Sequence, residues 1–302
     1  MANLIVVSLF PLIFLILMGY VIKRSGFLAD SFWASLEKLN YYILFPAMLF
    51  MTLANAKIEF SAISRMMQVV FLALAIVCIV LYSLRFLNKT PAGRFGVYMQ
   101  SIIRFNSYIG LAIVTLLLGH EGMALFAILI AVCIPLLNIL SVFAMTKPED
   151  MNINGIIKSL VSNPLILSCI VGIAFNSSGM SLWIGFEYFL KQLAVCTLPL
   201  GLLIVGAALR LNGFKSDLLP LVSNTLARLL IMPFLALGLC YILQLPKLET
   251  QVMVLFFALP TASASYILTR VLGGDSELMA NIISLQTLCA LVSLPLMMYL
   301  IL

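Results

Sequence analysis

Residues 104–112 read Arg-Phe-Asn-Ser-Tyr-Ile-Gly-Leu-Ala, and residues 259–266 read Leu-Pro-Thr-Ala-Ser-Ala-Ser-Tyr. Each stretch places small or polar residues in the middle of a long apolar run. Proline lacks a backbone donor and clashes with the preceding helical turn, and asparagine and glycine are weak helix formers. Both stretches therefore predict a helix that is interrupted part of the way along.

The chain around these stretches is too apolar for a water-soluble fold. Of its 302 residues, 64% are hydrophobic and 9% are charged, and the mean hydropathy is +1.19. Soluble domains are about 25% charged, and a membrane-spanning helix needs about 20 apolar residues. The composition predicts an all-α integral membrane protein with ten transmembrane helices and no room for a soluble catalytic domain. The predicted spans are 4–22, 36–54, 63–86, 96–118, 123–145, 160–176, 182–209, 217–243, 250–270 and 278–301.

The basic residues predict the orientation of the spans. Connections after odd-numbered spans, together with the adjoining parts of the spans, carry eleven Lys and Arg residues, and those after even-numbered spans carry four. The positive-inside rule places the richer side in the cytoplasm, so both termini are expected outside. No basic region or cleavage site precedes Lys23, which makes residues 4–22 a retained span rather than a signal peptide. We expect a multi-pass protein of the plasma membrane, of the bacterial inner-membrane type, and the scattered cations predict no nucleic-acid partner.

An internal repeat divides the chain into residues 1–150 and 151–302. Prolines and glycines recur at separations of 153 or 154 residues. The aligned pairs are Pro11 and Pro164, Gly19 and Gly172, Gly26 and Gly179, Pro46 and Pro199, and Gly119 and Gly273. Each copy holds five spans, and an odd number forces the second copy to insert upside down, as in many secondary transporters. Chance matches among helix-end glycines and prolines are the alternative.

The two interrupted stretches lie in spans four and nine, the fourth span of each copy. Asn106 aligns with Pro260, and Gly110 with Ala264. Aligned breaks of this kind mark the substrate site of many transporters, and broken backbone at membrane depth must line a cavity or be buried in protein. The half-helix N-termini offer free N–H groups that suit an anion. A tight helix crossing built from small residues is the alternative for span four.

The candidate substrate-binding residues come from these breaks and from the proline kinks beside them. They are Arg104, Asn106, Ser107, Gly110, Pro260, Ser263, Ser265, Tyr266, Asn40, Pro46, Thr197 and Pro199. Arg104 either attracts a carboxylate or extends toward the cytoplasmic end of its helix. Pro46 and Pro199 either line the cavity or form ordinary kinks. Arg228, in the middle of span eight, serves function or pairs with backbone carbonyls at a helix end.

Several expected residue types are missing from the apolar runs. No Asp or Glu lies in the middle of a span, which favours a neutral or anionic substrate over a cation. The single histidine, His120, and six cysteines without metal-site spacing predict no metal and no cofactor. We expect no enzyme activity. A coupling proton or sodium ion and a homodimer both stay open.

The order and spacing of these motifs resemble the auxin efflux carrier family, which includes plant auxin exporters and bacterial malonate- and malate-transporter-like proteins. The matching segments are 11–20, 26–28, 39–47, 104–110, 259–266, 273–275, Thr287 and 294–296. The resemblance implies a ten-helix inverted repeat with a scaffold part and a transport part, in which spans four and nine cross near the substrate at Asn106 and Pro260. Ala112 stands where the family often has proline, so we expect a milder first break. The short 146–158 connection resembles the bacterial members.

These observations predict a secondary transporter that moves a small organic anion, a mono- or dicarboxylate of auxin or malonate type, through the lipid bilayer by alternating access. A membrane sensor or interaction protein that keeps the fold without flux is the alternative.

Overall fold

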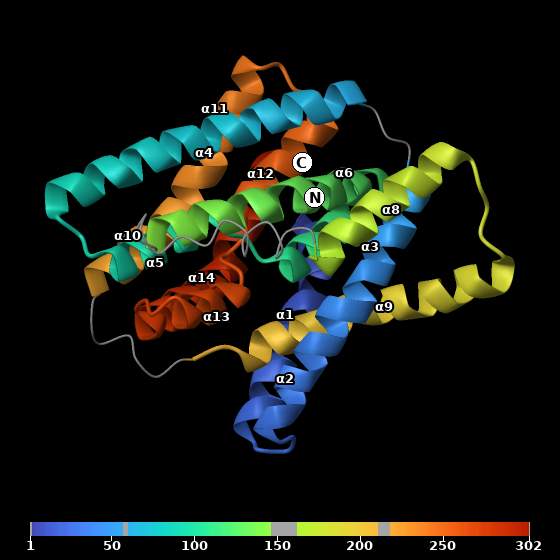
Figure 1. The fold of residues 1–302 in the computed structure, drawn as a ribbon, viewed down its shortest axis with the longest axis horizontal. Helices are drawn as coiled ribbons and strands as arrows, with labels where there is room; N and C mark the ends of the chain where they lie inside the picture. The colour runs from blue at the N-terminus through green and yellow to red at the C-terminus, as the bar shows by residue number, and fades with distance from the viewer. Residues whose placement is uncertain (1, 57–59, 146–161, 211–217, 302) are drawn as a thin grey trace.

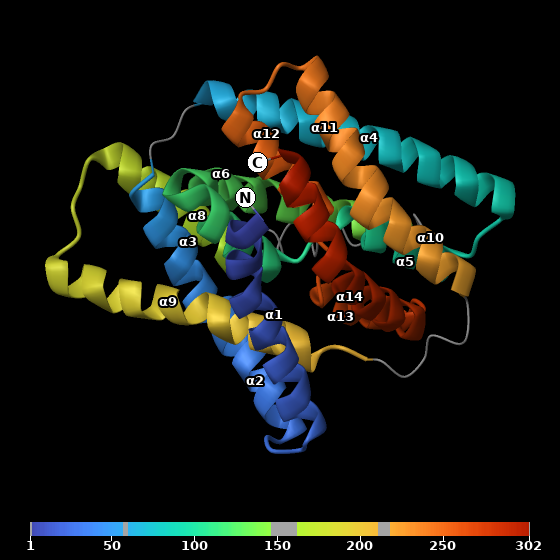
Figure 2. The same ribbon diagram turned by 180° about the vertical axis from the view of Figure 1, so that it is seen from behind.

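The computed structural model describes residues 2–56, 60–145, 162–210 and 218–301, all of them in helices or short connections (Figures 1 and 2). The charged 146–158 connection lies outside the described residues. The helices are α1 (Ala2–Arg24), α2 (Asp30–Leu39), η1 (Asn40–Leu44), α3 (Phe45–Ala54), α4 (Phe60–Asn88), α5 (Ala92–Ile103), α6 (Ser107–Met145), α8 (Pro164–Ser178), α9 (Ile184–Ala207), α10 (Leu218–Leu226), η3 (Ala227–Ile231), α11 (Met232–Ile242), α12 (Lys247–Ala258), α13 (Ala264–Val271) and α14 (Ser276–Ile301).

The outer surface of these helices confirms an all-α, multi-pass membrane protein. Within the described ranges, five segments are long and apolar enough to cross a membrane: Ile63–Asn88, Ala92–Met145, Ile184–Ala207, Leu218–Ile242 and Ser276–Ile301. Large apolar side chains point outward at helical spacing. On α1, Phe10 is 64% exposed and Phe14 58%, with Leu17 and Val21 on the same stripe. Apolar stripes on the outside of a helical protein are typical of contact with lipid.

Both predicted interruptions are present. Helix α5 ends at Ile103 and α6 begins at Ser107, while α12 ends at Ala258 and α13 begins at Ala264. The residues that follow α5 and α12 have extended backbone, with ψ of 151° and 143°. The first break is the shorter of the two, in agreement with the weaker helix breakers around it.

Four described glycines have a positive φ, and they form two of the aligned sequence pairs. Gly26 and Gly179 have φ of 70° and 67°, and Gly119 and Gly273 have φ of 64° and 69°. Glycine adopts this conformation at little cost, which is why it often ends a helix. Gly119 divides α6 into two helices at the point where a connection between spans four and five is expected. The aligned glycines therefore share a positive φ, although ψ of Gly119 is −156° and that of Gly179 is 9°.

Two close helix contacts are also related by the repeat. A Cβ atom added to Gly19 on α1 would lie 2.1 Å from the carbonyl oxygen of Leu203 on α9. One added to Gly172 on α8 would lie 3.1 Å from the carbonyl oxygen of Phe50 on α3. Small residues allow membrane helices to approach closely. Helix α1 thus packs on α9 as α8 packs on α3, and Figure 1 shows α3, α8 and α9 on the side opposite α4 and α10.

The prolines in the second and eighth predicted spans bend helices without breaking them. Pro46 and Pro233 each follow a π-helical turn, η1 or η3. In η1 the N–H group of Phe45 reaches back five residues to the carbonyl of Asn40. A π turn absorbs the missing donor and the steric clash of the ring. Pro199 lies inside α9, which continues through it.

We predict that Gly206→Ala destabilises the protein, because a Cβ atom there would lie 1.9 Å from the carbonyl oxygen of Ile16 and force α1 and α9 apart. Overpacking of this kind costs about 1–3 kcal/mol. Gly238→Ala is the matched control, since nothing lies within 4 Å of its added Cβ atom. Thermal denaturation of detergent-purified protein measures the difference, and equal midpoints for the two variants would contradict the packing described.

Candidate functional site

The two helix breaks meet. The backbone N–H group of Asn106 donates a hydrogen bond to the carbonyl oxygen of Pro260 at 2.8 Å. These are the residues that align in the two copies of the sequence. Gly110 allows the close approach, because a Cβ atom there would lie 2.3 Å from the ring of Phe126 and 2.6 Å from a methyl group of Leu259. The segments α5–α6 and α12–α13 therefore touch at their interruptions.

The N-termini of the two second half-helices differ. The side-chain oxygen of Asn106 accepts hydrogen bonds from the N–H groups of Tyr108 at 3.1 Å and Ile109 at 3.2 Å. This is a standard N-cap, and it satisfies donors that a helix start leaves open. Helix α13 begins after Ser263, which makes no side-chain cap. At the second break the N–H groups of Ser265 and Tyr266 donate instead to the carbonyl groups of Ala262 and Ser263, at 3.0 and 3.1 Å.

The carbonyl ends of the first half-helices converge on Arg228, which lies in η3 and is fully buried. Its Nε donates to the carbonyl of Leu259 at 2.6 Å, and its terminal nitrogens donate to Ile102 at 2.7 Å and Phe256 at 3.3 Å. Of the two interpretations of Arg228, the structure confirms pairing with backbone carbonyls at helix ends.

A buried polar network lies beside the crossing. The Thr261 hydroxyl lies 2.6 Å from both the Ser101 carbonyl and the Gln286 side-chain oxygen. The Gln286 amide donates to the same Ser101 carbonyl at 3.1 Å, and the Ser101 hydroxyl donates to Asn224 at 2.9 Å. Sequence reasoning missed this network. The available signal was Gln286, an amide in the middle of an otherwise apolar span.

A cavity of about 670 Å³ lies between the ends of α1 and α9 and helices α2, α13 and α14. Its volume is within the usual range for small-molecule sites, about 300–1,000 Å³. Three of the charged residues that line it are basic, Lys23, Arg24 and Arg210, and one, Glu37, is acidic. The Arg210 guanidinium lies over the ring of Tyr266, 4.9 Å from its centre. The charge balance of the walls favours an anion.

Two lining residues carry polar atoms without a partner. The indole nitrogen of Trp33 and the hydroxyl oxygen of Ser263 are both buried, and neither forms a hydrogen bond with the described residues. Buried polar groups are nearly always paired, so an unpaired donor at a cavity wall points to a missing acceptor. An indole N–H can only donate. Both atoms are thus buried donors beside the cavity that the described residues leave unpaired.

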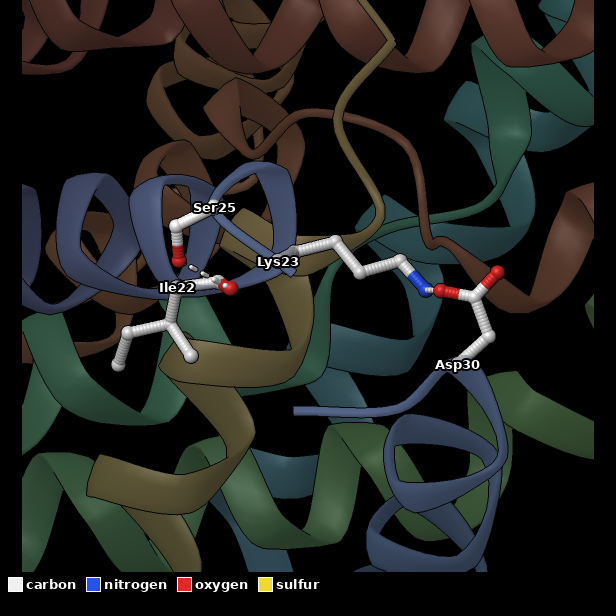
Figure 3. Close-up of polar contacts among 4 residues, drawn as sticks. All are labelled: Ile22, Lys23, Ser25 and Asp30. Atoms are coloured by element: carbon white, nitrogen blue, oxygen red, sulfur yellow. Dashed lines mark hydrogen bonds and ion pairs between the residues drawn. The ribbon is translucent and has the colours of Figure 1, made fainter. Parts of the chain in front are cut away.

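One cation at the rim is already engaged. Figure 3 shows Lys23 at the end of α1 reaching across to Asp30 at the start of α2, where the two form an ion pair. In the same turn the Ser25 hydroxyl donates to the carbonyl of Ile22 at 3.0 Å. These contacts fix the sharp connection between α1 and α2. Arg24 and Arg210 are left as the exposed cations of the cavity.

Arg104 and two serines from the breaks lie outside the walls of this cavity. Arg104 follows α5 and lies within electrostatic reach of Tyr41, and one of its terminal nitrogens is buried without a hydrogen-bond partner among the described residues. Ser107 begins α6. Ser265 is buried in α13, and its hydroxyl also lacks a partner there. Of the twelve predicted site residues, only Ser263 and Tyr266 line the cavity.

The residues beside the proline kinks tie helices together. The Asn40 amide donates to the carbonyl of Thr197 at 3.1 Å, and the Thr197 hydroxyl donates to the carbonyl of Leu44 at 2.8 Å. Leu44 and Thr197 are themselves 153 residues apart, the spacing of the repeat. Pro46 and Pro199 lie near this link and not at the cavity wall. In this structure all four serve packing between η1–α3 and α9.

Comparison with known proteins agrees with this architecture. Residues 150–298 match the family described as Membrane transport protein. An uncharacterized transporter of Methanothermobacter thermautotrophicus is 23% identical, and the match covers 93% of each chain. An uncharacterized transporter of Methanocaldococcus jannaschii is also 23% identical over 93% of this chain and 94% of its own. The second half of the chain is therefore similar to the membrane transport protein family, and nearly its whole length is similar to two archaeal proteins described as uncharacterized transporters.

Proposed function

We propose that the protein is a secondary transporter that carries a small organic anion, a mono- or dicarboxylate, by alternating access. The observation that supports this best is the basic cavity with an uncapped helix N-terminus and unpaired donors in its wall. Arg24 and Arg210 raise the local concentration of anions at the mouth. The Trp33 indole, the Ser263 hydroxyl and the start of α13 then donate to a carboxylate.

Ten spans in two inverted copies are the architecture that we propose for this transport. The segments α2–η1–α3, α5 with the first part of α6, α10–η3–α11 and α12–α13 each count as one span in this scheme. The aligned left-handed glycines and the matched α1–α9 and α8–α3 contacts support the repeat. Transporters of this kind alternate by rocking one part against the other around a site near the crossing.

The cavity would open to the cytoplasm. Lys23 and Arg24 follow the first span, and Arg210 follows the seventh, so the charge distribution assigns all three to the cytoplasmic side. The structure brings these residues from distant parts of the sequence around one cavity. This agreement supports an inward-facing state, with both termini outside the plasma membrane.

We predict that the two tryptophans respond differently to ligand. In Trp183→Phe, Trp33 is the one remaining indole and reports on the cavity, so mono- or dicarboxylates should change its fluorescence in purified protein. In Trp33→Phe the remaining Trp183 is 77% exposed, and its fluorescence should not change when the acids are added. The same acids should be taken up by proteoliposomes that contain the wild-type protein. Absence of both a fluorescence change and flux for every acid would contradict the proposal, and binding without flux would indicate the sensor function.

Substitutions in the cavity wall should weaken this binding. Ser263→Ala removes one donor, worth about 0.5–1.5 kcal/mol or up to roughly tenfold in affinity. Arg210→Gln should weaken binding several-fold at low salt and less at high salt, because exposed charges are screened. Arg65→Gln is the matched control, since Arg65 bonds the carbonyl of Gln244 away from the cavity. Equal affinities for all three variants would rule out this cavity as the binding site.

Asn106 variants separate helix capping from ligand binding. Asn106→Asp keeps an oxygen that caps α6 and should fold normally, but its negative charge beside the crossing should lower anion flux at least several-fold. Asn106→Ala loses the cap, at about 1 kcal/mol of stability. Denaturation midpoints and carboxylate flux in proteoliposomes measure both effects. If the Asp variant transports carboxylate as fast as the wild type, the crossing does not lie on the transport path.

We predict opposite accessibility for two single cysteines in a cysteine-free background. Met180→Cys lies in the connection between the sixth and seventh proposed spans, and Arg24→Cys follows the first. A membrane-impermeant maleimide should label the first variant on intact cells and the second only after permeabilisation. The reverse pattern would invert the proposed topology.

A further inference from the structure

Arg228 is the most deeply buried charge among the described residues, and its surroundings are unusual. All three of its hydrogen bonds go to backbone carbonyls, two of them in the last turns of α5 and α12 and one at Leu259 in the second break. One side chain therefore joins the carboxyl ends of both interrupted helices. No carboxylate of the described residues forms an ion pair with it.

Carbonyl groups at a helix end carry a partial negative charge and lack intrahelical partners. In transporters with broken helices, such carbonyl ends are where inorganic cations such as sodium bind. Here the guanidinium of Arg228 already occupies the space between them. Arginine stays protonated in proteins, so this positive charge cannot leave during a transport cycle.

The local backbone explains how a long side chain fits at this point. Arg228 lies in the π turn η3, just before Pro233, where the widened helix carries its side chain toward the crossing. Neighbouring polar groups are occupied as well, because Thr261 and Gln286 bond to each other and to Ser101. The carbonyl oxygens at this face of the crossing thus have a permanent partner.

We propose that Arg228 is a built-in cation that takes the place of an exchangeable one at the crossing, so that anion binding and transport proceed without sodium, potassium or lithium. The transport half of this proposal rests on the proposed function. The cation half concerns Arg228 and its carbonyl partners alone, and a denaturation experiment can test it without any substrate.

The first test uses the purified wild-type protein in sodium, potassium or choline chloride at equal ionic strength. The denaturation midpoint and its shift with a carboxylate should be the same in all three salts, and so should flux in proteoliposomes. A carboxylate shift or flux that requires sodium would overturn the proposal.

Two variants separate charge from hydrogen bonding. Arg228→Gln keeps an amide donor for the carbonyls but removes the charge, and should bind carboxylate roughly tenfold more weakly than wild type. Arg228→Lys keeps the charge and should bind within a few-fold of wild type. If wild type and the Gln variant bind carboxylate equally well, Arg228 only caps the helix ends, and the proposal is overturned.

A third variant leaves the carbonyl groups of Leu259, Ile102 and Phe256 without their arginine partner. Arg228→Ala should denature at a lower temperature in choline chloride and regain part of the loss in sodium chloride or guanidinium, whereas Arg228→Met, which fills the space, should not respond. A folded Ala variant that ignores every cation would overturn the proposal. If the neutral variants cannot be purified, the comparison of wild-type protein in the three salts still tests whether carboxylate binding requires sodium. If wild type binds no carboxylate, the proposed function fails, yet the response of the Ala variant still tests the cation site.

Discussion

A backbone N–H or C=O group inside a bilayer has no water to bond, and the two helix breaks of this protein release many such groups at one point. The rest of the central structure follows from that constraint. Asn106 bonds the open donors of α6, Arg228 bonds the open carbonyls of α5 and α12, and the two breaks bond each other through Pro260. Of the two helices that restart after the breaks, α13 lacks a side-chain cap, and residues at its start line the basic cavity.

The two breaks lie at aligned positions of the sequence but are built from different residues. The first break is short and has an asparagine that caps its own helix, whereas the second is longer and has a proline at the aligned position. The four glycines with positive φ nevertheless lie at aligned positions of the sequence.

Most of the helical plan could be predicted from the sequence, because apolar length, glycine and proline act locally. The breaks at 104–106 and 259–263 and the turn at Gly119 all follow from residues beside them in the chain. The cavity could not be predicted in this way. Arg24 and Arg210 served in the sequence only as markers of orientation, because the residues that line the cavity with them come from segments far apart in the chain. Asn40 and Thr197 were assigned to the site because of their polarity, whereas the structure uses that polarity to fasten helices together.

The pairing of α1 with α9 and of α3 with α8 has a consequence for synthesis in the cell. Each of these helices packs most extensively on a helix from the other half of the chain. Helix α1 is complete at Arg24, but its partner surface ends at Ala207. At translation rates of about 5–20 residues per second, α1 waits in the membrane for roughly ten to forty seconds before α9 exists. During that interval its glycine face, shaped for close contact with another backbone, is covered only by lipid or by the membrane-insertion machinery.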